Sequence, residues 1–166
     1  MSEAPRVRSI RLEALGDPAA GIAFLETKEQ ADARPDSYWQ ERAAGAALSE
    51  STAQFVAEAG RDWVGTLTVL RPQPGSRDYF GRPARTGRAL VVAVYVRPSH
   101  RGRGTLEALM DAAAKWTLDA GEAELQLDVH EDNGRARHAY ARLGFVPTGH
   151  TSAGPNGVEL EMVRIL

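Results

Sequence analysis

The stretch VYVRPSHRGRGTL, residues 94–106, joins an apolar run to a helix-patterned segment through a loop rich in arginine and glycine. The run that ends here, residues 88–96, is almost entirely β-branched or apolar, as in a strand buried on both faces of a sheet. Glycines let backbone N–H groups approach an anion at the start of a helix, and arginines add forked donors. The stretch predicts a strand–loop–helix unit that binds a phosphate-bearing ligand. A solvated basic turn is the simpler alternative for these residues taken alone.

The residues that follow complete a βαβ unit. Residues 103–120 place an apolar stripe on one helical face, and Leu125, Leu127 and Val129 then alternate with polar residues, as in a strand. A right-handed crossover makes the two strands parallel. The loop then lies at the carboxyl end of the first strand, where α/β sheets bind ligands.

A second motif lies downstream of this unit. Its pattern is N-x-x-A-x-x-x-Y-x-x-x-G-F, formed by Asn133, Ala136, Tyr140, Gly144 and Phe145. The loop and this motif together resemble the GNAT N-acetyltransferase superfamily, whose members transfer acetyl from acetyl-CoA to an amine. The family loop pattern is [Q/R]-x-x-G-x-[G/A]. Arg101 and Gly104 match it, and Leu106 stands at the last position.

The resemblance implies the parts of a cofactor site. The loop formed by Arg101, Gly102, Arg103, Gly104 and Thr105 would hold the CoA pyrophosphate, mainly through backbone N–H groups. The backbone of Val94, Tyr95 and Val96, near a bulge, would pair with the amide-rich pantetheine arm, as in strand addition. Asn133 and Ala136 would contact the cofactor arm, and a helix cap is the alternative role for Asn133.

Tyr140 is the catalytic residue that the resemblance implies, as donor of a proton or hydrogen bond to the departing thiolate. Its alternative role is packing, because it lies on the apolar stripe of a short helix. No carboxylate occupies the strand position at which some family members have a glutamate base. His130, Asp128, His100, Glu26 or a water molecule are the candidates for general base.

Composition narrows the function further. The chain has 166 residues, a formal net charge of −2 and no cysteine. The charge provides no broad field for nucleic acid or an anionic membrane, and no apolar run approaches the ~18 residues of a membrane span. Without cysteine, direct attack in a ternary complex is preferred to a covalent acyl-enzyme. The histidine spacing matches no metal site. We expect a cytoplasmic monomer or homodimer without a metal.

The predicted fold is α/β, or α+β in some schemes, with a mixed central sheet of about six to seven strands and helices on both faces. A single acetyltransferase domain spans residues 1–166, with residues 88–148 as its cofactor-binding core. Residues 71–87 form an exposed loop near the acceptor entrance, carrying the aromatic pair Tyr79 and Phe80. Residues 7–12 are expected to form a first strand, residues 29–36 a polar linker, and residues 152–157 a flexible connection.

The predicted function is an acyl-CoA-dependent N-acyltransferase, transferring acetyl from acetyl-CoA to a primary amine on a small molecule or peptide. A non-catalytic acyl-CoA-binding or regulatory module on the same fold is the alternative. A dinucleotide fold is a weaker explanation of the loop, because the third glycine position of that fingerprint holds Glu107.

Overall fold

The computed structural model describes residues 3–166 and contains one mixed sheet of six strands in the order β1-β2-β3-β4-β6-β5. The strands are β1 (Thr52–Ala59), β2 (Asp62–Leu70), β3 (Arg88–Val96), β4 (Glu124–His130), β5 (Val146–Gly154) and β6 (Gly157–Ile165). Strands β3 and β4 run parallel, and the other neighbours are antiparallel. The α/β class and the parallel pair are confirmed.

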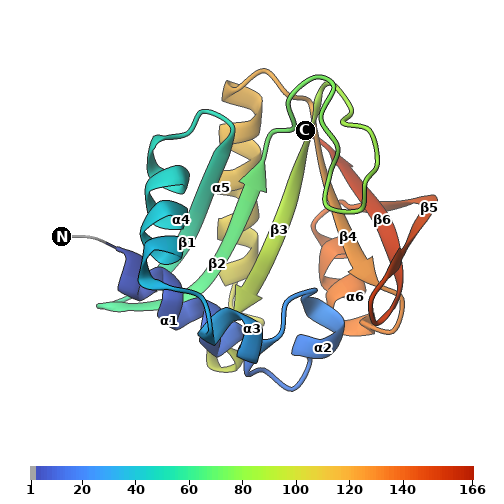
Figure 1. Ribbon diagram of the computed structural model, residues 1–166. Coiled ribbons are helices and arrows are strands. Elements are labelled where there is room, and N and C mark those ends of the chain that lie inside the picture. Colours follow the sequence, from blue (N-terminus) through green and yellow to red (C-terminus); the bar gives the residue numbers. More distant parts are fainter. Residues whose placement is uncertain (1–2) are drawn as a thin grey trace.

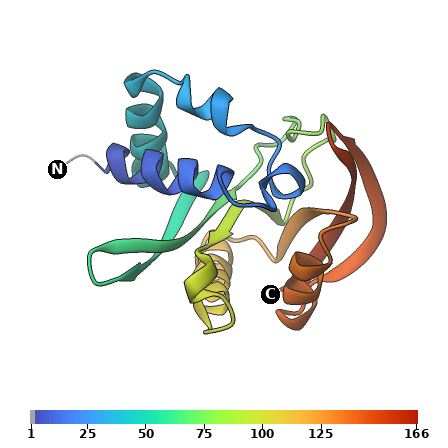
Figure 2. The same cartoon turned by 90° about the horizontal axis from the view of Figure 1, so that it is seen from below.

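Helices cover both faces of the sheet, as predicted. One face carries α1 (Ala4–Leu15), α2 (Ala20–Ala23), α3 (Lys28–Asp32) and α4 (Asp36–Leu48), and the other carries α5 (Thr105–Asp119) and α6 (Gly134–Arg142). Figure 2 shows the two layers, with the blue helices α1–α4 above the sheet and the yellow α5 and orange α6 below it. A 3₁₀ turn, η1 (Pro98–His100), connects β3 to the glycine loop before α5. In Figure 1 this connection lies at the same end of the sheet as α2 and α3.

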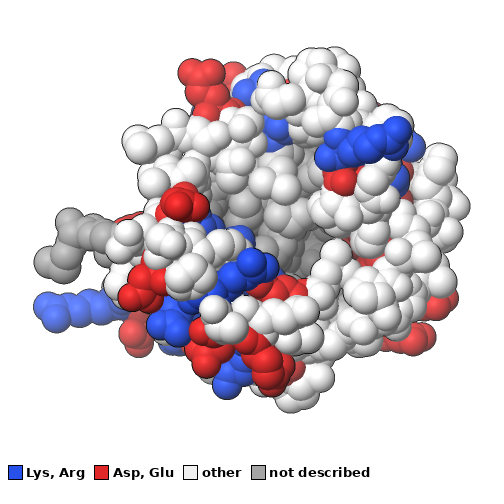
Figure 3. All heavy atoms as spheres, viewed as in Figure 1, with Lys and Arg blue, Asp and Glu red and all other residues white. Residues whose placement is uncertain are grey.

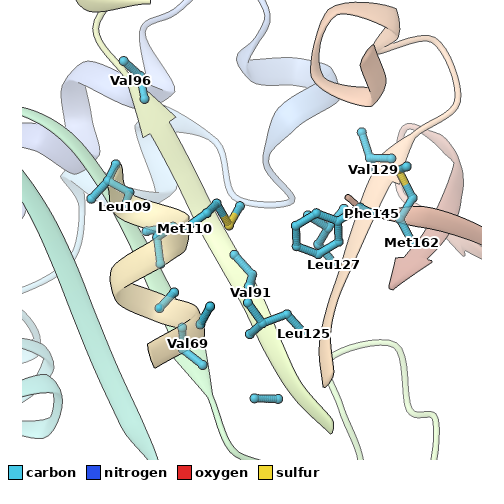
Figure 4. Close-up of a cluster of buried hydrophobic side chains, with 14 residues drawn as sticks. Val69, Val91, Val96, Leu109, Met110, Leu125, Leu127, Val129, Phe145 and Met162 are labelled. Atoms are coloured by element: carbon cyan, nitrogen blue, oxygen red, sulfur yellow. The ribbon is translucent and has the colours of Figure 1, made fainter. Parts of the chain in front are cut away.

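The main core lies between the sheet and the α5–α6 layer (Figure 4). Leu109 and Met110 of α5 are 3% and 0% exposed and pack on β-strand residues such as Val91 and Leu127. Phe145, 1% exposed, follows α6 and fills the space beside β4. A second cluster on the opposite face buries the apolar side of α1 against α4, β2 and β3. Burial of side chains this size contributes roughly 1.5–3 kcal/mol each.

Residues 7–12 form part of a helix, so the strand predicted there is wrong. The alternation of apolar and charged residues spans only six residues, and over a longer stretch the apolar residues also fit the spacing of a helix. Val7, Ile10 and Ala14 recur at helical spacing and are 3%, 3% and 2% exposed within α1, while Pro5 occupies its first turn.

Two other expectations about irregular segments are also wrong. The polar linker at residues 29–36 contains α3, which begins with a capping box formed by Thr27 and Gln30. The connection expected at residues 152–157 is mostly strand, because β5 continues to Gly154 by pairing with β6. Only Pro155 and Asn156 remain between the two strands. Polar composition concealed both elements, because backbone pairing and capping do not require apolar residues.

The segment at residues 71–87 has no helix or strand of its own but is attached to the sheet by ion pairs. Arg82 donates to Asp128 on β4 at 2.7 Å and to Asp78 within the segment at 2.6 Å. The Tyr79 hydroxyl donates to Asp128 at 2.7 Å. Arg82 also lies 3.5 Å from Glu161 of β6. The segment is therefore held over the β4–β6 part of the sheet, on the face that carries α1–α4 (Figure 2).

Within the described part of the chain, no helix combines the length and apolar character needed to cross a membrane.

Candidate active site

The site begins where β3 and β4 separate. Their parallel pairing covers only Arg88–Leu90 with Glu124–Gln126. Beyond Leu90, the β3 backbone groups that face β4 have no strand partner on that side among residues 3–166. A peptide-like ligand can therefore add to this edge as an extra strand.

A bulge in β3 lies within the separated region. Thr66 and Thr68 of β2 pair with Tyr95 and Val92, so Leu67 alone opposes Ala93 and Val94. Ala93 has φ 55°, a left-handed conformation that costs an L-residue about 1–2 kcal/mol. Strain of this kind, held in place by the surrounding sheet, concentrates at functional sites. The bulge expected beside residues 94–96 is present, one residue earlier.

A cavity of about 880 Å³ occupies the opening between the two strands. β3 lines it from Val91 to Val96, and β4 lines it from Leu127 to His130. Figure 3 shows this face of the molecule hollowed near its centre, with mostly uncharged residues (white) around the hollow and charged side chains at its rim. The volume is within the ordinary range for small-molecule and cofactor sites.

The cavity reaches both faces of the sheet because side chains alternate along β4. Leu127 and Val129 belong to the core beneath α5 and α6. Asp128 and His130 therefore point to the opposite face, together with their directly paired partners Glu161 and Glu159 on β6. We call the α5–α6 part of the cavity the loop side and the part at residues 128, 130 and 159 the carboxylate side.

On the loop side, Arg101, Gly102 and Gly104 line the cavity. Gly102 and Gly104 have φ 69° and 82°, which explains the need for glycine at both positions. The first bond within α5 runs from the Ala108 N–H to the Gly104 carbonyl, so the preceding N–H groups at its start have no partner inside the helix. Because they lie at the positive end of the helix dipole, these N–H groups are the candidate anion site.

The Arg101 side chain has a structural role. Its Nε donates to the Val96 carbonyl at 2.8 Å and its terminal nitrogen pairs with Asp17 at 2.6 Å. These bonds fix the loop between the end of β3 and the segment before α2. Burial alone would raise the pKa of Asp17, but the Ala19 N–H and Arg101 outweigh that effect and hold it below its ordinary value. Arg103 and Thr105 do not line the cavity, and Thr105 instead donates to the His100 carbonyl at 3.1 Å.

Helix α6 forms the remaining wall of the loop side. Asn133 caps it by accepting from the Ala136 N–H at 3.2 Å, so the helix-cap role is confirmed. Asn133 and Ala136 also line the cavity, as do Arg135 and Arg142. Within residues 3–166 neither arginine forms an ion pair, although the Arg135 charge acts on the Asp17 carboxylate. The sequence motif includes neither arginine.

Tyr140 connects the core to the cavity. Its ring centroid lies 6.0 Å from that of Phe145, and it is one of the residues lining the cavity. Among the described residues its hydroxyl has no hydrogen-bond partner. Burial raises the pKa of Tyr140 to about 12, against the opposing effect of the Arg135 charge. The phenol is therefore protonated at neutral pH and is available as a donor.

Two of the four residues considered as bases are carboxylates at the cavity, and both are already paired. Asp128 accepts two bonds from Arg82 and one from Tyr79, and its side chain is only 3% exposed. Glu26 pairs with Arg11 at 3.0 Å and with Arg34 at 3.5 Å. These partners already occupy the carboxylate oxygens of Asp128 and Glu26.

The two histidines are also occupied or distant. His130 Nδ1 accepts from the Asp132 N–H at 3.1 Å, so its Nε2 donates to the Asn156 carbonyl at 3.0 Å. Both nitrogens of this buried ring are then used. His100 lies in η1 and does not line the cavity. The structure brings His130, Asp128 and Glu26 to the cavity but leaves none of them free.

Glu159 of β6 is a cavity residue that the sequence did not indicate. Burial raises its pKa above the ordinary value, and Asp128 adds to the effect while His130 opposes it. Glu159 lies in a polar alternation near the C-terminus, far in sequence from both motifs, so no local signal marks it. Within residues 3–166, no three or more His, Cys, Asp or Glu side chains are arranged to hold a metal ion.

Comparison of the sequence with known protein families agrees with this geometry. The model of the acetyltransferase (GNAT) family matches residues 19–145. The chain belongs to the GNAT acetyltransferase family. The GNAT family model covers the loop, the bulged strand and the Tyr140 motif in one continuous match.

Individual GNAT relatives agree with this assignment. Streptothricin acetyltransferase of Streptomyces lavendulae is 38% identical over 74 residues, which are 45% of this chain and 39% of that protein. The crystal structure of nourseothricin acetyltransferase has a TM-score of 0.57 at 28% identity, covering 69% of this chain and 65% of that one. The chain thus spans less than two thirds of the length of either relative.

A third neighbour supports the fold over the whole chain. The structure of yncA from Salmonella typhimurium, solved with acetyl-CoA, has a TM-score of 0.74 at 16% identity and covers 99% of this chain and 88% of that one.

Proposed function

We propose that this protein is an acetyl-CoA-dependent N-acetyltransferase that acts on a primary amine by direct attack in a ternary complex. The observation that carries the proposal is a single cavity. It joins the anion site at the start of α5, the unpaired edge of β3, and the free hydroxyl of Tyr140. These are the three groups that a phosphate-bearing, amide-rich thioester requires.

The residues of the loop side fit such a cofactor. The N–H groups around Gly102 and Gly104 bind the pyrophosphate, and Arg135 and Arg142 add charge to the phosphates. The backbone of residues 94–96 pairs with the pantetheine amides as an added strand, although the Val96 carbonyl already accepts from Arg101. When bound, acetyl-CoA supplies the activated acetyl group, and the protein contributes orientation and proton transfer.

Tyr140 takes the role of acid in this mechanism. The acceptor amine forms a bond to the thioester carbonyl carbon, and the carbon–sulfur bond then breaks. The Tyr140 hydroxyl gives its proton, or a hydrogen bond, to the sulfur as negative charge develops there. A purely acyl-CoA-binding module would have no use for a protonated phenol at this position, so we do not favour that alternative.

The acceptor enters from the carboxylate side. Tyr79 and Phe80 of the 71–87 segment line the cavity there, together with Phe24 after α2. Aromatic walls beside carboxylates suit a small cationic amine. Streptothricin, named in the relative from Streptomyces lavendulae, is the first acceptor to test, and a peptide amine is the second. A cytoplasmic location and a monomeric or homodimeric state belong to the same proposal and are tested by cell fractionation and size-exclusion chromatography.

Acetyl-CoA should raise the melting temperature of the wild-type protein. A ligand at 100 times its Kd stabilises the folded state by about 2.7 kcal/mol. The variant Gly104→Val should lose most of this shift, because valine cannot adopt φ 82° without moving the N–H groups of the anion site. Gly60→Val is the matched control, since φ 64° imposes the same backbone strain in the β1–β2 turn. An equal shift with NAD would contradict the proposal.

The variant Phe80→Ala should raise KM for the acceptor by about 10-fold and leave acetyl-CoA affinity unchanged. Phe80 lines the cavity beneath the Arg82 guanidinium, which lies 5.2 Å from its ring centroid. The change therefore removes an apolar wall on the acceptor side only. Steady-state kinetics with each substrate varied in turn separate the two effects. A larger change in cofactor affinity than in acceptor KM would contradict this placement.

A further inference from the structure

The proposed reaction needs a group that removes a proton from the acceptor. Some carboxylates that line the cavity already form ion pairs, and others do not. Five acidic residues line the cavity: Asp17, Glu26, Glu107, Asp128 and Glu159. Asp17, Glu26 and Asp128 each pair with an arginine at 3.0 Å or less. Glu107 is exposed in the first turn of α5, beside the anion site. Among the described residues, only Glu159 is both on the carboxylate side and without an ion pair or hydrogen bond.

The position of Glu159 is set by the β4–β6 ladder. It pairs directly with His130 on β4 and with Ser152 on β5, so these side chains share one face of the sheet. The two ring nitrogens of His130 are occupied by the Asn156 carbonyl and the Asp132 N–H, so His130 forms no hydrogen bond with Glu159. The backbone of Gly154 lies alongside, where an added Cβ would meet the Glu159 carboxylate at 3.4 Å. Glu159 is thus held at the cavity wall, and no residue within 3–166 donates a hydrogen bond to its carboxylate.

A partly buried carboxylate without a partner is costly, and such groups are kept where a ligand supplies the missing charge. An ammonium group supplies that charge and up to three donors. The other titratable groups around Glu159 do not compete for this role. Asp128 is held by Arg82 and Tyr79, and His150 on β5 lies 3.9 Å from Glu161 instead.

We propose that Glu159 binds the ammonium form of the acceptor and is the general base that removes its proton, so that the enzyme selects cationic primary amines. This inference rests on the proposed acetyltransferase function. The N–H bond of the ammonium breaks, and its proton moves to the Glu159 carboxylate. The freed lone pair forms the bond to the acetyl carbonyl carbon. The carbonyl π pair moves to oxygen and returns as the carbon–sulfur bond breaks, whose electron pair goes to sulfur. Tyr140 provides the proton that yields the free thiol, and water removes the second N–H proton from the new amide and returns a proton to the Tyr140 phenolate.

The raised pKa of Glu159 suits this role. It narrows the difference in pKa between the carboxylate and an ammonium group, so the proton transfer is less unfavourable than it would be to an ordinary glutamate. The base works only when ionised. Activity that depends on it is therefore lost as the pH falls through the pKa of Glu159 and is complete above it.

The kinetic test compares wild-type protein with Glu159→Gln, which keeps the shape and removes the charge. Acetyl-CoA and a panel of streptothricin, 1,5-diaminopentane and a lysine-containing peptide are assayed by thiol release between pH 5 and pH 9. We expect kcat/KM to fall by about 10²-fold or more and the acid limb of its pH profile to disappear. Glu159→Asp should recover part of the rate. Glu131→Gln, an exposed change just beyond His130, should behave as wild type.

The outcomes separate the two proposals. If the wild-type protein acetylates an acceptor and Glu159→Gln has the same kcat/KM and the same acid limb, the role of Glu159 is overturned. The acetyltransferase function is then left intact. No thiol release from any wild-type reaction, with acetyl-CoA bound, would overturn both. Loss of activity with unchanged acetyl-CoA affinity supports both.

A second measurement is independent of turnover. The pKa of Glu159 is raised on folding, so its ionisation destabilises the folded state above that pKa and has no effect where the group is protonated in both states. Glu159→Gln should raise the melting temperature at pH 7.5 by about 1–3 °C, and the gain should vanish near pH 4. A lower melting temperature at pH 7.5 would show that Glu159 has a stabilising partner and would overturn the proposal.

Discussion

Replacing Tyr140 with phenylalanine should lower kcat by about 10²-fold or more, which is the usual contribution of one general acid. The ring would still pack on Phe145, and within residues 3–166 the lost hydroxyl has no hydrogen-bond partner to leave unsatisfied. Stability and acetyl-CoA affinity should therefore change little, because the interaction matters mainly as charge develops on sulfur. A single-turnover assay of thiol release measures the effect on the chemical step directly.

The leaving group and the pH provide the controls for Tyr140. A donor thioester whose thiol has a lower pKa should recover part of the rate of Tyr140→Phe, since a better leaving group needs less protonation. The wild-type enzyme should show no loss of activity due to Tyr140 below about pH 10, because the pKa of this phenol is about 12. A Tyr140→Phe variant with near wild-type kcat, where chemistry limits the rate, would leave the tyrosine as a packing residue.

Replacing Arg82 with alanine should have the largest effect on stability. Arg82 joins the 71–87 segment to Asp128 and Glu161, whose side chains are 3% and 1% exposed. Removing one partner from a buried ion pair costs about 3–5 kcal/mol, because the remaining charge is left in a poorly solvated site. We expect the melting temperature to fall by about 10 °C, measured by scanning calorimetry. Acceptor KM should rise as well, because the segment that carries Tyr79 and Phe80 loses its attachment.

Arg85→Ala is the matched control in the same segment. The Arg85 side chain is 46% exposed and lies 3.4 Å from Glu161. When Arg85 is removed, Glu161 still has Arg88 at 3.4 Å. An exposed pair of this kind contributes about 0–1 kcal/mol. Melting temperatures of the two variants within about 2 °C of each other would show that the buried network around Arg82 does not hold the segment.

Local patterns in the sequence were sufficient for the central βαβ unit. Continuous apolar residues in β3, the helical stripe of α5 and the alternation in β4 each predict one element, and the glycines at 102 and 104 predict the loop between them. Asn133 was recognised as a cap because capping requires only one side chain and the next turn. These features depend on short-range physics, so they can be read without knowing the tertiary structure.

The N-terminal and C-terminal segments show where local patterns fail. Apolar and charged residues alternate over residues 7–12, but this window is too short to distinguish a strand from a helix. Burial of the apolar side chains against β2 and β3 stabilises the helix α1. Residues 151–153 carry no apolar signal, but pairing with β6 made them part of β5. In both cases partners distant in sequence supplied the stabilising contacts.

The sequence alone determined that this chain has a glycine loop at a helix start, a tyrosine on the following short helix, and no cysteine for a covalent route. Only the tertiary structure decided which carboxylates are free. Asp128 and Glu26 were candidates by sequence, and arginines up to 46 residues away in the chain neutralise them. Glu159 had no motif, and the β4–β6 register brings it to the cavity, where no described residue forms an ion pair or hydrogen bond with its carboxylate. The physical reason is that charge pairing depends on distance in space, which residue spacing along a chain does not record.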